Sequence, residues 1–385
     1  MVDNNHVGNA VVPDANGRFS WGNGVVSMVF DTAGDEPVRL SGLSGRGMDA
    51  AGVDAAPQRD PRPIVEVLAA NTGSHDNRLA LIATVAGSKL RFTGAVASVV
   101  PAPGEAGAAG SAPAGTCRLE ITQFAPYDQL QPSGRSMESS DPGAARKLAE
   151  AAAVAVDGAG TGGGASAASG AAGDGSRVGT PADGLTVVSV FEAYPGVSAV
   201  RAYTILRSPR PFPVEAVTSL NLTLPLDASG ATVESSRLYW GDSAWAVEND
   251  WHCANLRDTA VRDRNLVINP GESSSRFALI SASTWSTGVH QPAGIIEASG
   301  AGAGVAAFSV MWQIEHNGAW EWEVGENDPG LHIAAFGPEY QDHHWDTALG
   351  EGNDFTSVPV SFSVAAGDWQ RAVAEMTLQR RALRR

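Results

Sequence analysis

Residues 185–206, LTVVSVFEAYPGVSAVRAYTIL, indicate the fold class of this chain. Two runs rich in valine, threonine, alanine and aromatic residues, 185–194 and 197–206, are separated only by the Pro195-Gly196 pair. β-Branched and aromatic side chains favour strands, whereas a Pro-Gly pair favours a turn. The segment therefore predicts two antiparallel strands joined by a tight turn.

The same pattern recurs along most of the chain. Further strands are predicted at residues 25–30, 64–69, 118–124, 214–224, 277–283, 294–297, 306–315, 320–324, 331–336 and 355–364. Turn-forming residues separate these runs, and no helices alternate with them. No repeat of fixed period is visible, which argues against a propeller. We therefore predict a mostly β protein built as a large antiparallel β-sandwich.

Two other kinds of segment interrupt or end this pattern. Residues 101–116 and 151–176 are low-complexity Gly/Ala/Ser sequence, so we expect disordered insertions at about 101–116 and 132–184. Residues 144–156 favour either a short helix or a wholly disordered loop. After residue 368 a helical pattern places Trp369, Ala372, Val373, Met376 and Leu383 on one apolar face. We expect a β domain at residues 1–365 and an amphipathic linker helix at 366–385.

Charge and composition exclude several classes of partner. The 385 residues include 26 Lys+Arg against 42 Asp+Glu, giving a net charge of −16, which argues against nucleic acid and anionic membranes. No apolar run reaches the roughly 18 residues that a membrane helix needs. The N-terminus has no secretory signal pattern. Cys117 and Cys253 are expected to be reduced, buried thiols of a cytoplasmic protein, with a single disulfide as the alternative.

Tryptophan is the strongest functional clue. All but one of the 10 tryptophans lie in the second half of the chain, Trp21 being the exception. Indole rings fill large β cores and also stack on sugar rings, and composition alone favours the core. The clusters 240–251, 285–291 and 312–323 also contain Asn, Asp, Glu, His or Gln. This mixture is typical of carbohydrate sites, where aromatic faces hold the ring and polar groups bind the hydroxyls.

Other motifs give weaker signals. Glu321 and Glu323 lie on one strand face, and a solvated pair is favoured over a catalytic one. Adjacent His343 and His344 point to opposite sides of a strand, so a zinc site is not expected. Residues 316–319, with Asn317-Gly318, predict a hairpin turn with positive φ. No nucleophile elbow, phosphate loop or Cys-x-x-Cys motif occurs, so we expect no cofactor and no metal.

The tryptophan clusters also carry a family resemblance. The stretch 312–326, WQIEHNGAWEWEVGE, resembles the N-terminal domain of glycoside hydrolase family 36 α-galactosidases of the actinobacterial type. So do WSTGVHQ (285–291), YWGDSAWAVENDW (239–251), GPEYQDHHW (337–345) and FTSVPV (355–360). The likeness covers about residues 64–100 and 185–385. The last helix resembles the linker that leads into that family's catalytic barrel.

The resemblance implies a fold and a function. The fold is a β-supersandwich packed over the mouth of a (β/α)8 barrel, which supplies the catalytic residues for hydrolysis of α-galactosides. Because the chain is expected to lack the barrel, no catalytic residue is assigned here, and the chain alone is expected to be inactive. The implied partners are α-galactoside sugars, the barrel and, in the full-length form, further copies of the same protein.

The resemblance also implies five substrate-binding residues. Trp245 and Trp320 are expected to stack on the sugar ring, while His290, Gln291 and Asn317 contact hydroxyls or position loops.

Two other functions stay open: a stand-alone carbohydrate-binding module, and a structural or oligomerisation domain. The terminal helix discriminates between these functions. A protruding helix with an uncovered apolar face favours a missing barrel, whereas a helix folded back on the sandwich favours a free-standing module.

Overall fold

In the computed structural model, β8 (Gly184–Ala193) and β9 (Ala199–Arg207) pair antiparallel, which confirms the hairpin predicted at residues 185–206. The structure describes residues 8–49, 62–70, 72–73, 81, 83–100, 115–130, 183–224, 226–261, 275–282, 284–300, 306–327 and 330–384. They all belong to one compact unit that comprises residues 6–130 and 182–385. Apart from residues 115–116 and 183–184, the expected insertions lie outside the described residues, as does the possible helix at 144–156.

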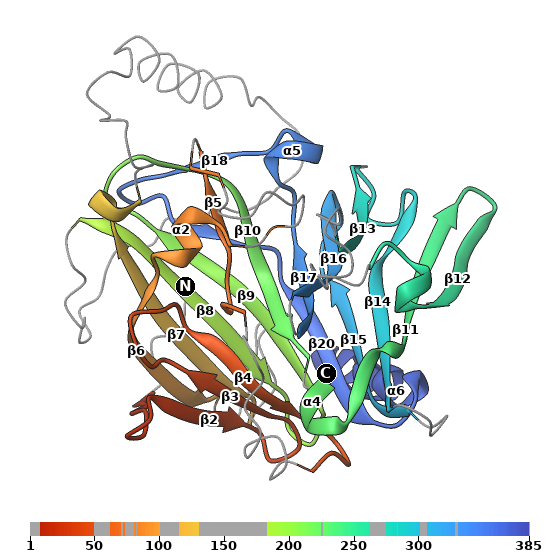
Figure 1. The fold of residues 1–385 in the computed structure, drawn as a ribbon. Coiled ribbons are helices and arrows are strands. Elements are labelled where there is room, and N and C mark those ends of the chain that lie inside the picture. Colours follow the sequence, from red (N-terminus) through yellow and green to blue (C-terminus); the bar gives the residue numbers. More distant parts are fainter. Residues whose placement is uncertain are drawn as a thin grey trace, which may run out of the picture. The chain divides into compact units, whose positions relative to one another are not determined.

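The hairpin sits in the middle of an 11-stranded main sheet, in the order β1-β6-β7-β8-β9-β20-β15-β14-β11-β12, with β19 paired to β9 (Figure 1). All its neighbouring strands pair antiparallel. Besides β8 and β9, its strands are β1 (Asn9–Ala10), β6 (Arg91–Val99), β7 (Cys117–Pro126), β11 (Ala231–Ala244), β12 (Val247–Asn255), β14 (His290–Gly300), β15 (Ala306–Ile314), β19 (Phe355–Thr356) and β20 (Val360–Ala366).

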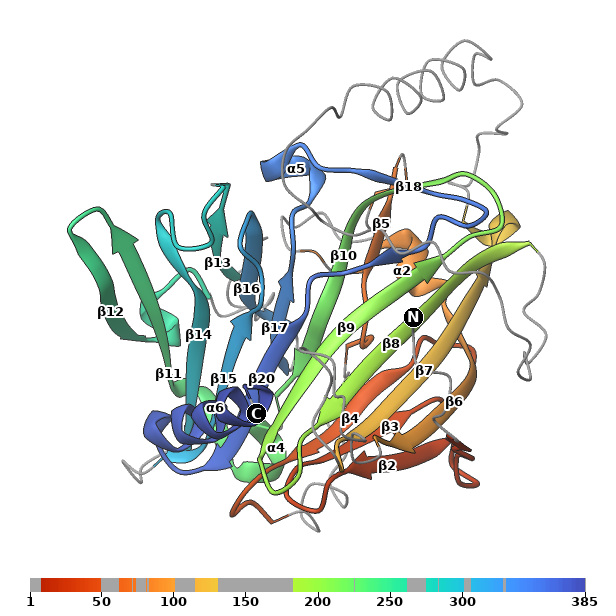
Figure 2. The same ribbon diagram turned by 180° about the vertical axis from the view of Figure 1, so that it is seen from behind.

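Two smaller sheets pack against the main sheet (Figure 2). A six-stranded sheet has the order β13-β16-β17-β10-β18, with β5 paired to β10, and a three-stranded sheet has the order β2-β3-β4. Their strands are β2 (Arg18–Gly22), β3 (Ser27–Asp31), β4 (Arg39–Ser44), β5 (Val67–Ala69), β10 (Phe212–Thr223), β13 (Arg276–Ser281), β16 (Trp320–Asn327), β17 (Gly330–Phe336) and β18 (Thr347–Leu349). This arrangement confirms the mostly antiparallel β class.

Aromatic side chains from different sheets meet in the core. Trp312 of β15 and Trp322 of β16 meet edge to face with ring centroids 5.0 Å apart, and Phe30 of β3 lies 5.4 Å from Phe191 of β8. Three of these rings have no exposed surface, and Phe191 is 4 % exposed. Burial of such large rings is a major source of stability. The core interpretation therefore holds for several tryptophans.

Short helical turns connect the strands, and one longer helix ends the chain. No described helix combines the length and the apolar character that a membrane crossing requires. The helices are α2 (Val85–Ser88), α4 (Leu226–Ser229), α5 (Tyr340–His343) and α6 (Trp369–Leu383), with 3-10 turns at Tyr127–Gln129 and Leu256–Asp258.

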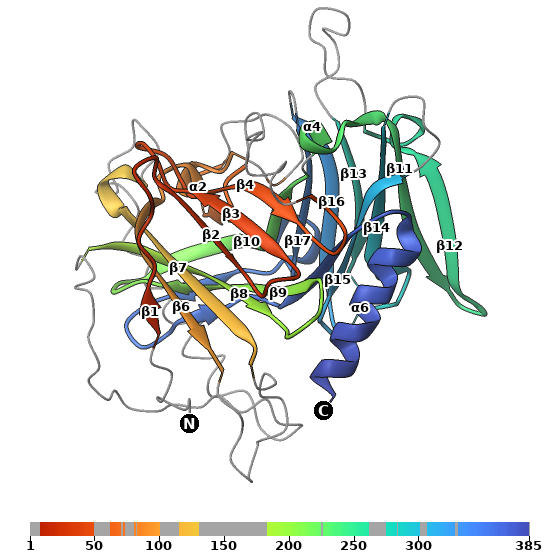
Figure 3. The same ribbon diagram turned by 90° about the horizontal axis from the view of Figure 1, so that it is seen from below.

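Helix α6 folds back on the main sheet, where it packs on β14, β15 and β20 (Figure 3). The expected apolar face is only partly correct. Ala372 and Met376 are buried, but so are Glu375 and Gln379, while Trp369 is 37 % exposed. The predicted pattern missed these two polar residues because their partners lie on distant strands.

Glu375 is the main polar anchor of α6. Its carboxylate accepts a 2.7 Å hydrogen bond from the backbone N–H of Ser198 and is ion-paired with Arg46. Ser198 also donates its hydroxyl hydrogen to the carbonyl of Val364, at 2.6 Å. Because Arg46, Ser198 and Val364 belong to three separate segments, this anchor ties α6 to the loop after β4, the start of β9 and β20.

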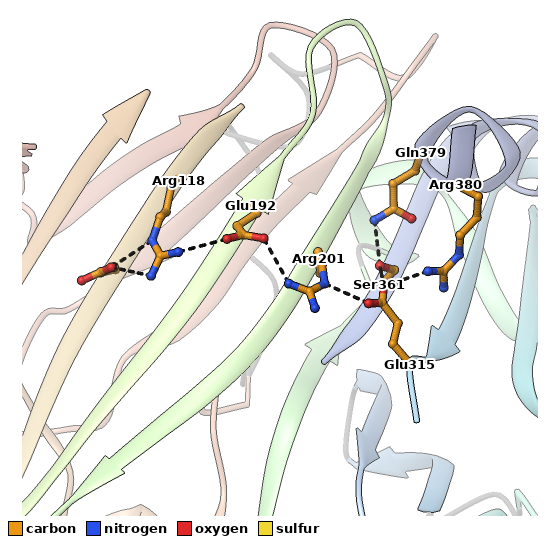
Figure 4. A network of polar contacts seen from close by, with 8 residues as sticks. Arg118, Glu192, Arg201, Glu315, Ser361, Gln379 and Arg380 are labelled. Carbon is orange, nitrogen blue, oxygen red and sulfur yellow. Dashed lines mark hydrogen bonds and ion pairs between the residues drawn. The ribbon is translucent and has the colours of Figure 1, made fainter. Parts of the chain in front are cut away.

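A row of charged residues continues from α6 across the outer face of the main sheet (Figure 4). Arg380 of α6 binds Glu315 at 2.9 Å, and Glu315 also binds Arg201 at 2.9 Å. Glu192 then bridges Arg201 and Arg118, with separations of 3.3 and 3.0 Å. Arg118 also binds Glu120 of its own strand at 2.8 Å, so the row contains three arginines and three glutamates and its charges balance.

The two cysteines differ from expectation in burial. Both are free thiols, as expected. Cys117 is half-buried, but Cys253 is exposed because it lies on β12, the edge strand of the main sheet. The expectation of two buried thiols is therefore wrong for Cys253 and only partly met for Cys117.

Candidate functional site

Three connections bring most of the tryptophan clusters to one edge of the molecule. They are the β11–β12 hairpin tip (residues 242–251), the loop before β14 with its first residues (284–291) and the connection between β15 and β16 (315–319). The register places Asp242 opposite His290, and Ser281 opposite Trp320, so the three segments are neighbours. We call this region the tryptophan edge.

Two tryptophans at the tryptophan edge face solvent. Trp245, at the β11–β12 hairpin tip, is 89 % exposed, and Trp285 is 69 % exposed. Trp251 is less exposed, and its indole N–H donates a 2.8 Å hydrogen bond to the side-chain oxygen of Asn249. Val247 and Val289 add exposed apolar surface. Single exposed apolar residues are ordinary, but a group of aromatic rings at one edge is typical of a binding surface.

A carboxylate between two imidazoles lies beside these rings. Asp242 Oδ1 is 2.7 Å from His290 Nδ1, and Asp242 Oδ2 is 3.0 Å from His252 Nε2. The ring of His252 also lies 5.4 Å from that of Trp240. The carboxylate therefore fixes the orientation of both imidazoles, which remain partly exposed.

The structure separates the adjacent residues His290 and Gln291. Successive residues of a strand point to opposite faces, and His290 shares its face with Asp242. Gln291 lies against Gly241, where an added Cβ would come within 2.7 Å of Gln291 Cγ and 3.3 Å of Trp251. His290 and Gln291 therefore both lie at the tryptophan edge, but their side chains are on opposite faces of the sheet.

Trp320 is placed differently from the other predicted site residues. Its ring has no exposed surface, and its N–H donates a 2.6 Å hydrogen bond to the carbonyl of Ser286. No face of this ring is open for stacking on a sugar. Its position instead ties β16 to the loop that carries Trp285.

Asn317 is exposed at the tryptophan edge, but its turn is not the predicted hairpin. Neither Asn317 nor Gly318 has a positive φ. The reason is topological, because β15 belongs to the main sheet and β16 to the six-stranded sheet. Residues 315–319 therefore cross between two sheets, and a tight turn with positive φ is not needed.

A buried acidic cluster adjoins the tryptophan edge, and its burial was not predicted from the sequence. Glu321 and Glu323 share Arg276, as their common strand face predicts, but both are buried and not solvated. Burial raises the pKa of Glu321 to about 8, against the attraction of Arg276 and with the help of the repulsion from Glu323, Glu339 and Asp342. Burial also raises the pKa of Glu323.

Helix α5 closes this cluster. Glu339 caps the helix by accepting hydrogen bonds from the backbone N–H groups of Gln341 and Asp342, and its carboxylate lies 3.1 Å from His343 Nδ1. Among the described residues, Glu321, Glu339 and Asp342 are the one set of carboxylates close enough for a cation, with ligand atoms within 4.8 Å of one another. Glu321 is already paired with Arg276, so the set by itself assigns no metal.

Comparisons with known proteins bear on the fold. No protein-family model and no curated protein matches the chain. Solved structures do match: the α-galactosidase from Lactobacillus brevis has a TM-score of 0.56 at 10% identity, over 95% of this chain and 42% of that one. A family 36 α-galactosidase from Geobacillus stearothermophilus, solved with raffinose, has a TM-score of 0.55 at 12% identity, over 93% and 42%.

The galactosidase domain of an α-galactosidase-sucrose kinase gives a similar match, with a TM-score of 0.55 at 9% identity, over 94% of this chain and 42% of that one. Nearly the whole chain is therefore matched, but it spans only about two-fifths of each matched protein. The chain has a fold found within solved family 36 α-galactosidases.

Proposed function

We propose that this chain is the N-terminal, non-catalytic domain of an α-galactosidase-type glycoside hydrolase. The observation that carries the proposal is the coverage: more than nine-tenths of this chain matches about two-fifths of each of several α-galactosidases. Catalysis would then belong to a barrel outside this chain. Water exclusion and pocket shape at such a barrel depend on covering segments.

The tryptophan edge is the part of this domain that we assign to the sugar. Trp245 and Trp285 are exposed, and their rings would stack on C–H-rich sugar surfaces. His290, fixed by Asp242, would contact a hydroxyl from one face of the sheet, and Gln291 from the other. Asn317 is a further exposed hydroxyl contact, whereas Trp320 positions the loop of Trp285.

One observation favours a second candidate, a stand-alone carbohydrate-binding module. Helix α6 is docked on the main sheet by Glu375, Gln379 and Arg380, and it does not protrude. A docked helix needs no further domain to cover it. The module would use the same tryptophan edge but would bind sugar without any catalytic partner.

A pair of measurements on the purified chain separates the two candidates. Incubation with a chromogenic α-galactoside is expected to give no turnover in either case, and turnover would refute both. Calorimetric titration with raffinose then discriminates: tight saturable binding, lost in Trp245→Ala and Trp285→Ala, supports the module. Weak or no binding supports a domain that completes its site only with a barrel. The codons after Arg385 provide an independent check, because a frame that continues into a different fold would refute the first candidate.

A further inference from the structure

A pocket of about 530 Å³ lies far from the tryptophan edge, at the open ends of the three-stranded sheet. Its lining comes from the end of β2, the turn into β3, and the loop after β4. The loop after β4 contacts the last residues of β20, through the Arg46–Ala365 bridge. The tryptophan edge lies at the other end of β20, where Val360 pairs with Ile314. The two sites are therefore separate.

Serine hydroxyls form one side of this pocket. Gly22 pairs with Ser27, and Ser27 pairs with Ser44, so all three lie on one face of neighbouring strands about 4.8 Å apart. Ser20, two residues before Gly22, lies on the same face. The hydroxyls of Ser20, Ser27 and Ser44 have no hydrogen-bond partner among the described residues, although Ser44 is only 5 % exposed.

Gly22 keeps this surface flat and open. A Cβ at this position would lie 1.9 Å from the carbonyl oxygen of Val26, so only glycine fits without a shift of the backbone. Gly24, in the turn between β2 and β3, has a φ of +84° and no atom within 4 Å of the place of a Cβ. The pocket is thus bounded by backbone that a ligand can approach closely.

The opposite walls are apolar and are held in place. The side chains of Val25 and Met48 line them, whereas the side chains of Trp21 and Val26 lie in the core behind the pocket. Arg46 is the one charged residue of the lining, and its guanidinium is held by the carboxylate of Glu375 and by the carbonyl of Gly196, at 2.6 Å. Because Arg46 is already neutralised by Glu375, the pocket offers no net charge to an anion.

We propose that this pocket binds a neutral polyhydroxylated ligand, a mono- or disaccharide, at a second site. Serine hydroxyls both donate and accept, as sugar hydroxyls require, and apolar walls suit the C–H faces of a sugar ring. The volume lies within the range of roughly 300–1,000 Å³ that is usual for small-molecule sites. The site does not depend on the proposed function, which concerns the tryptophan edge.

Chemical-shift mapping on the ¹⁵N-labelled chain tests this proposal. Galactose, glucose, melibiose and raffinose are titrated, with inorganic phosphate and galacturonate as charged probes. We expect one or more of the neutral sugars to shift the amides of residues 20–27 and 44–48 in a saturable way. The double variant Ser27→Ala/Ser44→Ala should weaken that binding at least tenfold, because two hydrogen bonds of ordinary strength are lost. Trp245→Ala should leave it unchanged.

Each other outcome has a defined meaning. The proposal is overturned if no neutral sugar shifts these amides, if only phosphate or galacturonate does, or if binding survives the double variant. Should the double variant fail to fold, the exposed Ser20→Ala provides the same test with a smaller expected loss. Shifts confined to residues 242–251 and 284–291 would support the tryptophan edge alone, so failure of this pocket is distinguishable from failure of the proposed function.

Discussion

The buried carboxylate of Glu321 makes the stability of this protein depend on pH. Its pKa is raised from 4.5 to about 8 in the folded protein, chiefly by burial. Between these values the folded protein keeps a proton that the unfolded chain has lost, so stability falls as the pH rises. Each pH unit within this window costs about 1.4 kcal/mol, which amounts to about 4 kcal/mol between pH 5 and pH 8.

Glu321→Gln removes this pH dependence of stability, because glutamine mimics the protonated form of the glutamate at every pH. The two proteins should be of similar stability near pH 5, and the variant should be more stable by up to about 4 kcal/mol near pH 8. Other titrating groups, including Glu66 and Glu323 with their raised pKa, act in both proteins and largely cancel in the difference. The assay is urea unfolding at half-unit intervals from pH 5 to 8.5.

A matched control is Glu351→Gln, since Glu351 is exposed in the turn before Asn353. This variant should follow the wild type at every pH. Parallel curves for wild type and Glu321→Gln would refute the reasoning, because they would mean that Glu321 is ionised throughout and that Arg276 outweighs its burial. If Glu321→Gln is less stable than the wild type at pH 8, the claim that burial keeps Glu321 protonated is refuted more strongly.

Three further predictions concern packing and exposure. Gly294→Ala would place a Cβ 2.3 Å from Trp312, so it should cost about 1–3 kcal/mol in urea unfolding, whereas Gly94→Ala, with open space around it, should cost under about 1 kcal/mol. Glu375→Ala removes the polar anchor of α6, and hydrogen exchange should show lost protection of residues 369–383 with β8 and β9 unchanged. Trp245→Ala, at an exposed position, should alter stability by no more than about 0.5 kcal/mol.

Local sequence predicted the central strands β8 and β9 well and the β11–β12 hairpin at one end of the main sheet poorly. β8 and β9 combine β-branched residues with a Pro-Gly turn, so they could be located within two residues of their ends. β11 and β12 were missed because 237–255 contains glycine, aspartate and asparagine at positions that look like turns. Most of β12 is exposed, and it is a strand because its backbone pairs with β11 and not because it has an apolar face.

The candidate site could also be predicted only in part from local sequence. The clusters around Trp245, His290 and Asn317 could be recognised from composition, and the register does bring them to one edge. The sequence does not predict which of these side chains are buried. Trp320 and Glu321 are adjacent on β16 and point to opposite faces, yet both are buried. The partner of Glu321 is Arg276, 45 residues away, and only the pairing of β13 with β16 makes them neighbours.

The polar contacts that hold α6 on the main sheet bear on the choice between the two proposed functions. The hydrophobic effect is non-directional, so apolar contact specifies the rotation of a helix less strictly than hydrogen bonds do. Glu375, Gln379 and Arg380 instead form directional bonds to Ser198, Ser361 and Glu315, and these bonds are satisfied together only in one orientation of the helix. A free-standing module has no need of a fixed direction at its last helix, whereas a domain that must present its tryptophan edge to a catalytic partner does. The chemistry of this interface therefore favours the first proposal, even though the docked position of α6 alone suits the second.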